Sequence, residues 1–105
     1  MGAVIVDWMR SPFDRAHKGA LKKIRPDEMG GQVAKELISR SKIPPTSFDD
    51  VLVGCAYPEG EQGYNLGRMI AFLAGLPNTI PGATFNRLCG SSMEAIHVAA
   101  ANIES

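Results

Sequence analysis

Cysteine and histidine are both scarce in this chain of 105 residues, which contains two of each. Two cysteines cannot build a disulfide framework, and the separation of Cys55 from Cys89 matches no zinc-binding pattern. His17 and His97 lie too far along the chain from both cysteines to complete a metal site. We therefore expect no metal ion, and we interpret Cys55 and Cys89 as free thiols whose roles depend on their own surroundings.

The chain also lacks an excess of charge and a long apolar run. Eleven Lys and Arg residues balance eleven Asp and Glu residues, so no net positive charge is available to attract nucleic acid or an anionic membrane. The tightest basic cluster, residues 18–25, is interpreted as a solvated loop rather than an anion site. No apolar stretch approaches the roughly 20 residues that span a bilayer, and the basic leader of a signal peptide is missing. We expect a soluble, cytoplasmic protein with no nucleic-acid partner and no membrane insertion.

The residues that are present suit a folded globular protein. Hydrophobic residues make up 45% of the chain and charged residues 21%, which is not the composition of a disordered protein. Short apolar runs predict buried strands at residues 3–6, 50–55 and 83–85. Helical spacing of apolar residues predicts helices that begin at Pro26, after an Asn65 cap, and at Cys89 or Gly90.

Strands that alternate with helices imply an α/β fold with the order βαβαβα. We expect a parallel sheet with helices on both faces. The first helix should stop before Pro44-Pro45, and Gly30-Gly31 inside it indicates either a close approach of another backbone or a weak helix. The last helical pattern reaches Ser105 without a stop signal, and three strands are few for an independent sheet, so the domain is predicted to be truncated.

The junction between the third strand and the third helix carries the chemistry. In open α/β sheets, sites lie beyond the carboxyl ends of the strands, where the first turns of helices present backbone N–H groups. A cysteine at such a helix start, here Cys89, is favoured as a thiolate by the helix dipole, and its own N–H can donate to an oxyanion. The small residues Gly90, Ser91 and Ser92 let a substrate carbonyl approach. Cys89 is therefore a candidate nucleophile, arranged like the nucleophile elbow of serine hydrolases.

Position alone leaves a structural alternative open for both cysteines. A free cysteine is more often a small buried hydrophobe than a nucleophile. Cys55 follows a buried strand and precedes Ala56, so we predict a structural role for it. His97 lies eight residues after Cys89, more than two helical turns away, and is predicted to be a packed or exposed helix residue rather than a base.

Several motifs in the right order resemble one enzyme family. The segment from Asn86 to His97, which reads Asn-Arg-Leu-Cys-Gly-Ser-Ser-Met-Glu-Ala-Ile-His, is similar to the nucleophile signature of thiolases, in particular the 3-ketoacyl-CoA thiolases of fatty-acid degradation. Further similar stretches are Ile5-Val6-Asp7, Arg10-Ser11-Pro12-Phe13 (with Ser11 in place of the usual threonine), Val53-Gly54-Cys55, the residues from Glu61 to Arg68, and Ala74-Gly75-Leu76-Pro77 with Pro81. The resemblance covers nearly the whole chain and implies that residues 1–105 are the amino-terminal part of a thiolase N-terminal domain.

The resemblance implies an acyltransferase. Cys89 would attack the keto carbonyl of a 3-ketoacyl-CoA, acetyl-CoA would leave, and free CoA would release the shortened acyl group, or the sequence would run in reverse as a condensation. Coenzyme A would enter as substrate, with no metal or redox cofactor, and the full-length enzyme would be a homodimer or homotetramer. The family's activating Gly-His-Pro histidine, its second cysteine in Cys-x-Gly, its Asn-Glu segment and most of its coenzyme A pocket would lie beyond Ser105. We therefore expect the isolated chain to be inactive and, because residues 3–6 would form an exposed apolar edge, prone to associate.

Three polar residues and two rival functions remain open at this stage. Gln62, Asn65 and Arg68 belong to a stretch that the family uses near the subunit interface and active-site floor, and they are equally well read as a polar loop and helix cap. The rival enzyme is a ketoacyl-synthase-type condensing enzyme, which also places a cysteine at a helix start. The alternative that is not an enzyme is a non-catalytic thiolase remnant or assembly module, in which Cys89 would react no faster than an ordinary thiol.

Overall fold

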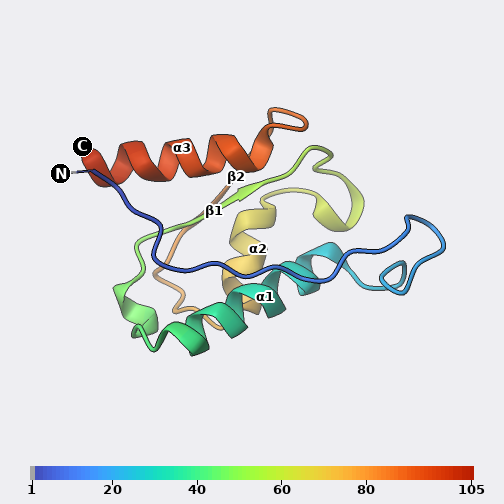
Figure 1. Cartoon of the computed structure of the whole chain (residues 1–105), viewed down its shortest axis with the longest axis horizontal. Coiled ribbons are helices and arrows are strands. Elements are labelled where there is room, and N and C mark those ends of the chain that lie inside the picture. Colours follow the sequence, from blue (N-terminus) through green and yellow to red (C-terminus); the bar gives the residue numbers. More distant parts are fainter. Residues whose placement is uncertain (1) are drawn as a thin grey trace.

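Two parallel strands and three α-helices make up the regular structure of residues 2–105, which are described by a computed structural model (Figure 1). Two short 3-10 turns connect them. The elements in chain order are α1 (Pro26–Ser41), η1 (Pro45–Ser47), β1 (Val51–Gly54), η2 (Gly60–Gln62), α2 (Leu66–Leu73), β2 (Gly82–Phe85) and α3 (Ser91–Glu104). The predicted α/β class is confirmed, and each α-helix and strand from α1 onward lies where the sequence placed it, to within a few residues. The two 3-10 turns were not predicted.

The sheet pairs β1 with β2 in parallel, from Val51 opposite Gly82 to Gly54 opposite Phe85. The pairing continues past β1, because the Cys55 N–H donates to the Phe85 carbonyl at 2.9 Å. Helix α3 lies over one face of the sheet and α2 under the other, while α1 packs on α2 (Figure 1). Helices therefore cover both faces, as predicted. None of the helices in the described part of the chain is long and apolar enough to cross a bilayer.

The predicted first strand, Ala3–Val6, is wrong for this structure. These residues form no strand, and the side chains of Val4, Ile5 and Val6 are 78–79% exposed. A strand needs the edge of another strand to satisfy its backbone, and β-branched residues alone do not supply one. The sheet accordingly has two strands instead of the predicted three, and the apolar exposure expected for an unpaired segment 3–6 is present.

Two glycines in α1 explain how closely α1 approaches α2. A Cβ atom added to Gly30 would lie 2.6 Å from the Ile70 Cδ1 atom, and one added to Gly31 would lie 2.5 Å from the Leu73 Cβ atom. Gly31 is therefore a packing requirement, because the Leu73 Cβ atom and backbone cannot move aside as the end of the Ile70 side chain can. This favours the close approach of the two alternatives left open by the sequence. Helix α1 ends at Ser41, before Pro44-Pro45 as predicted, and Lys42 follows with a left-handed φ of 59°.

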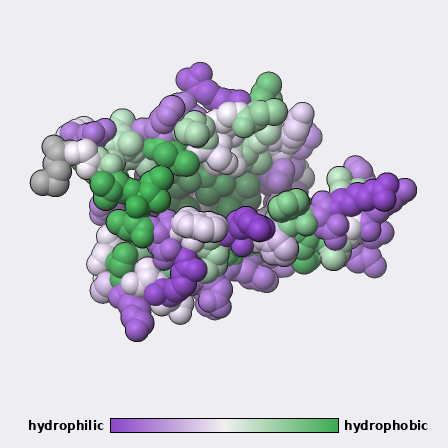
Figure 2. All heavy atoms as spheres, viewed as in Figure 1, coloured by the Kyte–Doolittle hydropathy of each residue, from purple (hydrophilic) through white to green (hydrophobic). Residues whose placement is uncertain are grey.

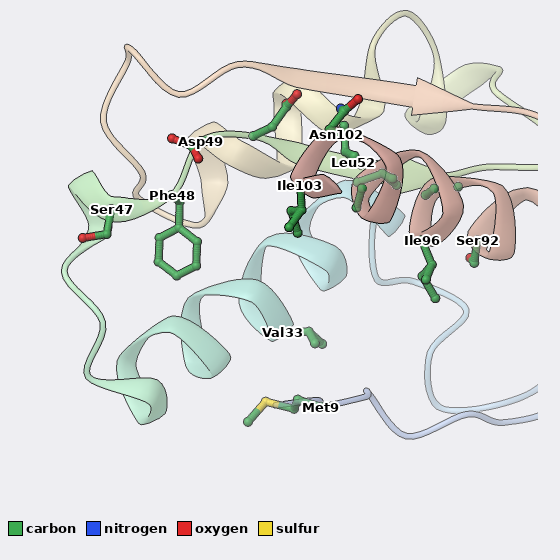
Figure 3. Close-up of a pocket in the computed structure, with 15 residues that line it drawn as sticks. Met9, Val33, Ser47, Phe48, Asp49, Leu52, Ser92, Ile96, Asn102 and Ile103 are labelled. Carbon is green, nitrogen blue, oxygen red and sulfur yellow. The ribbon is translucent and has the colours of Figure 1, made fainter. Parts of the chain in front are cut away.

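A hollow of about 940 Å³ opens along the side of the sheet (Figures 2 and 3). Ile96 and Ile103 of α3 point into it from one side, and Val33 of α1 lies on the other (Figure 3). Leu52 of β1 and Met9 of the amino-terminal segment also line it. In the described residues, β1 pairs only with β2, so its other edge faces this hollow without a partner strand. The fold thus leaves one edge of the sheet uncovered.

One ion pair at the start of α1 makes stability depend on pH. The Arg25 guanidinium donates to both carboxylate oxygens of the buried Asp27, at 3.1 Å each, and this pairing lowers the pKa of Asp27 despite its burial. A carboxyl with a lowered folded pKa contributes stability that is present above its unfolded pKa, near 3.8, and that is lost as the pH falls through the folded value.

We therefore expect Asp27→Asn to lower the free energy of unfolding at pH 7 and to lower it progressively less as the pH falls below about 4. Urea titrations of both chains at a series of pH values measure the difference. Glu36→Gln is the matched control, because Glu36 is an exposed carboxylate of the same helix with no ion pair in residues 2–105. A pH-independent effect of Asp27→Asn would contradict the assignment.

Candidate active site

Cys89 lies in the short loop between β2 and α3. It stands two residues before Ser91, the first residue of α3, and its side chain is exposed. Among residues 2–105, no carbonyl or side-chain oxygen accepts a hydrogen bond from the Cys89 N–H. A bound carbonyl oxygen therefore has both a thiol and an unoccupied amide donor available at this position, which is the pair that acyl transfer to a cysteine requires.

The residue before the cysteine has an unusual backbone conformation. Leu88 has a φ of 51°, in the left-handed region that costs a branched residue of this size about 1–2 kcal/mol. The turn is closed by the two N–H groups that follow Cys89, since Gly90 donates to the Arg87 carbonyl at 3.0 Å and Ser91 to the Leu88 carbonyl at 3.1 Å. The Asn86 carboxamide oxygen accepts from the Leu88 N–H at 2.9 Å. This turn lies where the sequence suggested an arrangement like a nucleophile elbow. The sequence did not reveal its strained backbone.

The first residue of α3 is tied back into the turn. Ser91 is buried, with 4% of its surface exposed. Its hydroxyl donates to the Leu88 carbonyl at 2.6 Å and accepts from the Arg87 N–H at 2.9 Å. The Arg87 guanidinium in turn pairs with Glu94 of α3 at 3.1 Å. The loop is thus fixed to the helix that follows it.

The end of β1 sets the position of this helix start. A Cβ atom added to Gly54 would lie 2.3 Å from the carbonyl carbon of Ser91 and 2.3 Å from the Ser92 nitrogen. Only glycine leaves room for the α3 backbone to lie directly on the strand. The sequence pattern predicted only that Gly54 belongs to a strand and did not reveal this contact. A glycine at the end of an apolar run was the available signal, because such a glycine often marks a close backbone approach.

The other predicted residues occupy different surroundings. Cys55 is 6% exposed and packs with Leu66 and Ile70, which is the structural place predicted for it. His97 is an exposed residue of α3, and His17 is exposed in the loop before α1. No hydrogen bond joins either histidine to Cys89 within the described range. The structure therefore brings no base to the thiol from residues 2–105.

Gln62, Asn65 and Arg68 hold the chain together locally. The Gln62 side-chain amide donates to the Tyr57 carbonyl at 2.9 Å. Asn65 caps α2 by accepting from the Arg68 N–H at 3.3 Å, and its amide donates to the Gly82 carbonyl at 2.7 Å. The Arg68 guanidinium donates to the carbonyl groups of Ile80 and Asn78. Of the two interpretations left open, these contacts favour the polar loop and helix cap.

The large hollow is separate from the cysteine. Its lining includes Gly54 and Ser92, the two residues in contact at the start of α3, but it does not include Cys89. The hollow therefore contacts the start of α3 and does not extend to Cys89. The candidate site is the exposed turn itself, and the hollow is the unpaired edge of the sheet.

Comparison with known proteins identifies the family to which this arrangement belongs. Residues 3–105 match the family model described as the N-terminal domain of thiolase. The chain belongs to the thiolase family. Two thiolase relatives are the 3-ketoacyl-CoA thiolases of Saccharophagus degradans, 46% identical over 101 residues, and of Acinetobacter baumannii, 45% identical over 100 residues. Each match covers 95% of this chain and 26% of the relative, so this thiolase chain spans about a quarter of the length of those enzymes.

A solved thiolase structure has the same fold over most of the chain. The Acat5 thiolase from Ascaris suum, determined in complex with coenzyme A, superimposes with a TM-score of 0.77 and 30% sequence identity. The superposition covers 85% of this chain and 23% of the Ascaris protein. The thiolase family is an acyltransferase family, and the resemblance stated from the sequence motifs is confirmed at the level of family and fold.

Proposed function

We propose that Cys89 is the acyl-accepting nucleophile of a thiolase-type acyltransferase that cleaves 3-ketoacyl-CoA with coenzyme A. The observation that carries the proposal is the exposed Cys89 thiol beside an amide N–H that no group in residues 2–105 occupies. The family membership and the names of the relatives support the reaction class, and the coenzyme A complex of the Ascaris thiolase supports the substrate class.

The proposed reaction proceeds in two balanced steps. The Cys89 thiol gives up its proton, and its sulfur attacks the keto carbonyl carbon of the substrate. The carbon–carbon bond beside that carbonyl breaks, and the departing enolate of acetyl-CoA takes up a proton. The sulfur of free coenzyme A then attacks the acyl-cysteine, loses its own proton, and leaves as shortened acyl-CoA while Cys89 regains a proton. The Cys89 N–H would donate to the oxygen that becomes negative in each attack.

Most of the proton transfers need groups that residues 2–105 do not provide at Cys89. A general base contributes about 10²–10⁴-fold, and an oxyanion donor about 10²–10³-fold. We therefore propose that the chain supplies the nucleophile and one donor, and that the family's histidine and second cysteine, which the resemblance places after Ser105, supply the rest. Fatty-acid degradation, a cytoplasmic location, and a homodimer or homotetramer as the assembled enzyme remain part of the same proposal.

A chimera tests the proposed function. The matching quarter of the Saccharophagus degradans thiolase is replaced by this chain, and thiolysis of acetoacetyl-CoA is measured beside the isolated 105-residue chain. We expect turnover by the chimera and at least about 10³-fold less by the isolated chain, because the isolated chain lacks the base. A folded chimera without thiolysis, or an isolated chain with turnover like that of the chimera, would contradict the proposal.

A further inference from the structure

We infer that Ser91 is a positioning residue for Cys89. Its hydroxyl holds Leu88 in the left-handed conformation, and that conformation directs the Cys89 N–H and the Cys89 sulfur toward the same acyl carbonyl group. The inference rests on the proposed function, because it concerns how the proposed nucleophile is presented to an acyl group. Ser91 itself is buried and does not reach the acyl group.

The hydrogen bonds of Ser91 bracket the strained residue. The Ser91 hydroxyl accepts one hydrogen bond from the Arg87 N–H, which precedes Leu88 in the chain. It donates the other to the carbonyl of Leu88 itself, on the far side of the φ bond. A change of φ at Leu88 from 51° to the ordinary negative range would move these two backbone groups apart. The steric cost at Leu88 favours a return to a negative φ. Both hydrogen bonds of the Ser91 hydroxyl oppose that change. Two such hydrogen bonds together are comparable in strength with the steric cost of the left-handed conformation at one residue.

The position of the hydroxyl is itself fixed by the sheet. The Ser91 carbonyl carbon lies against Gly54, where even a Cβ atom would come within 2.3 Å. Ser91 is consequently anchored on its backbone by β1 and bonded through its side chain to the turn. The Leu88 carbonyl belongs to the same peptide group as the Cys89 N–H. It accepts from the Ser91 hydroxyl and from the Ser91 N–H, so Ser91 helps to set the direction of the Cys89 donor.

Ser92 provides a matched control on the same helix. It is the next residue, it is exposed, and its hydroxyl makes no hydrogen bond within the described part of the chain. Substitution of either serine by alanine removes one hydroxyl group from the first turn of α3. Only the Ser91 change removes the two bonds at the turn.

The test compares two reactions of Cys89 in the chimera with the Saccharophagus degradans thiolase by mass spectrometry of the Cys89 peptide. Alkylation by iodoacetamide needs only an accessible thiol. Acetyl transfer from acetyl-CoA also needs the amide donor: the Cys89 proton leaves to buffer, the new sulfur–carbon bond forms, the bond to the coenzyme A sulfur breaks, and that sulfur takes a proton from buffer. We expect Ser91→Ala to lower the ratio of acetylation to alkylation rates by about tenfold or more, and Ser92→Ala to leave the ratio unchanged.

Two further variants keep the test decisive. Leu88→Gly added to Ser91→Ala should recover much of the ratio, because glycine adopts a φ near 51° without steric cost. Ser91→Thr keeps the hydroxyl and should retain more of the ratio than Ser91→Ala. If Ser91→Ala loses its helical circular dichroism, these two variants carry the comparison. An unchanged ratio in folded Ser91→Ala, or no recovery in the double variant, would overturn the inference.

A spectroscopic measurement separates this inference from the proposed function. The nuclear Overhauser effect between the amide and α protons of Leu88 reports the sign of φ, because these two protons lie closer together at a positive φ than at a negative one. We expect Ser91→Ala but not Ser92→Ala to weaken this effect. An unchanged effect overturns the positioning role whatever the reactivity of Cys89. Conversely, if the Leu88 effect weakens as expected but Cys89 in the folded chimera is alkylated and takes up no acetyl group from acetyl-CoA, the proposed function fails and the structural part of the inference holds.

Discussion

Cys89→Ser is expected to lower thiolysis by the chimera by about 10³-fold or more, the largest effect of any single change in the chain. The serine hydroxyl keeps the shape of the side chain, but it ionises far less readily than a thiol and is a poor nucleophile without a base matched to it. Because Cys89 is exposed and belongs to neither core cluster of residues 2–105, the substitution should leave folding unchanged. The loss should therefore be in kcat, measured by steady-state cleavage of acetoacetyl-CoA.

Cys55→Ala is the control for Cys89→Ser. Cys55 lies in the core beside Leu66 and Ile70, so its substitution should reduce stability modestly while leaving most of the activity of the folded enzyme. Retention of thiolysis by Cys89→Ser would remove Cys89 from the mechanism. A comparable loss in both variants would indicate that the cysteines act through structure and would contradict the assigned roles.

Gly54→Ala is expected to destabilise the 105-residue chain by about 3 kcal/mol, at the upper end of the range for overpacking. The added methyl would meet the backbone of Ser91 and Ser92 at 2.3 Å, and backbone atoms of a helix cannot rotate out of the way as a side chain can. Helix α3 must therefore move away from β1 or unwind at its start. Urea unfolding followed by circular dichroism measures the loss.

Gly90→Ala is the matched control for this change, because a Cβ atom there meets only the Arg87 carbonyl oxygen at an ordinary 3.5 Å. We expect its effect on the free energy of unfolding to be below about 1 kcal/mol, since its φ of −92° suits any residue. In Gly54→Ala the ratio of acetylation to alkylation rates at Cys89 should also fall, because the helix start that presents Cys89 is displaced. Equal stability of the two alanine variants would show that the close approach at Gly54 is not a constraint.

The sequence predicted the elements from α1 onward because each has local signals. Pro26 with two acids begins α1, Asn65 caps α2, and short apolar runs at 51–54 and 82–85 form the two strands. These signals act over a few residues and need no distant partner. The first strand failed for the opposite reason, because Ala3–Val6 has the composition of a strand but no paired edge in the structure.

The chemistry of the site was partly visible in the sequence. A cysteine just before a helix, followed by small residues, could be read from spacing alone. The left-handed φ of Leu88 could not be predicted, because leucine has no preference for that conformation and adopts it only where tertiary contacts hold it there. The same is true of the bonds made by Ser91 and of the contact at Gly54, which depend on how α3 meets β1 in space.

Trapping the acyl group on the protein is the most direct test of the central claim. The chimera is mixed with acetoacetyl-CoA in the absence of free coenzyme A, quenched in acid and digested, and its peptides are analysed by mass spectrometry. We predict that the acetyl group is found as a thioester on Cys89 within one turnover, and that added coenzyme A removes it. An acetyl group carried by another residue, or active enzyme that never acylates Cys89, would contradict the account.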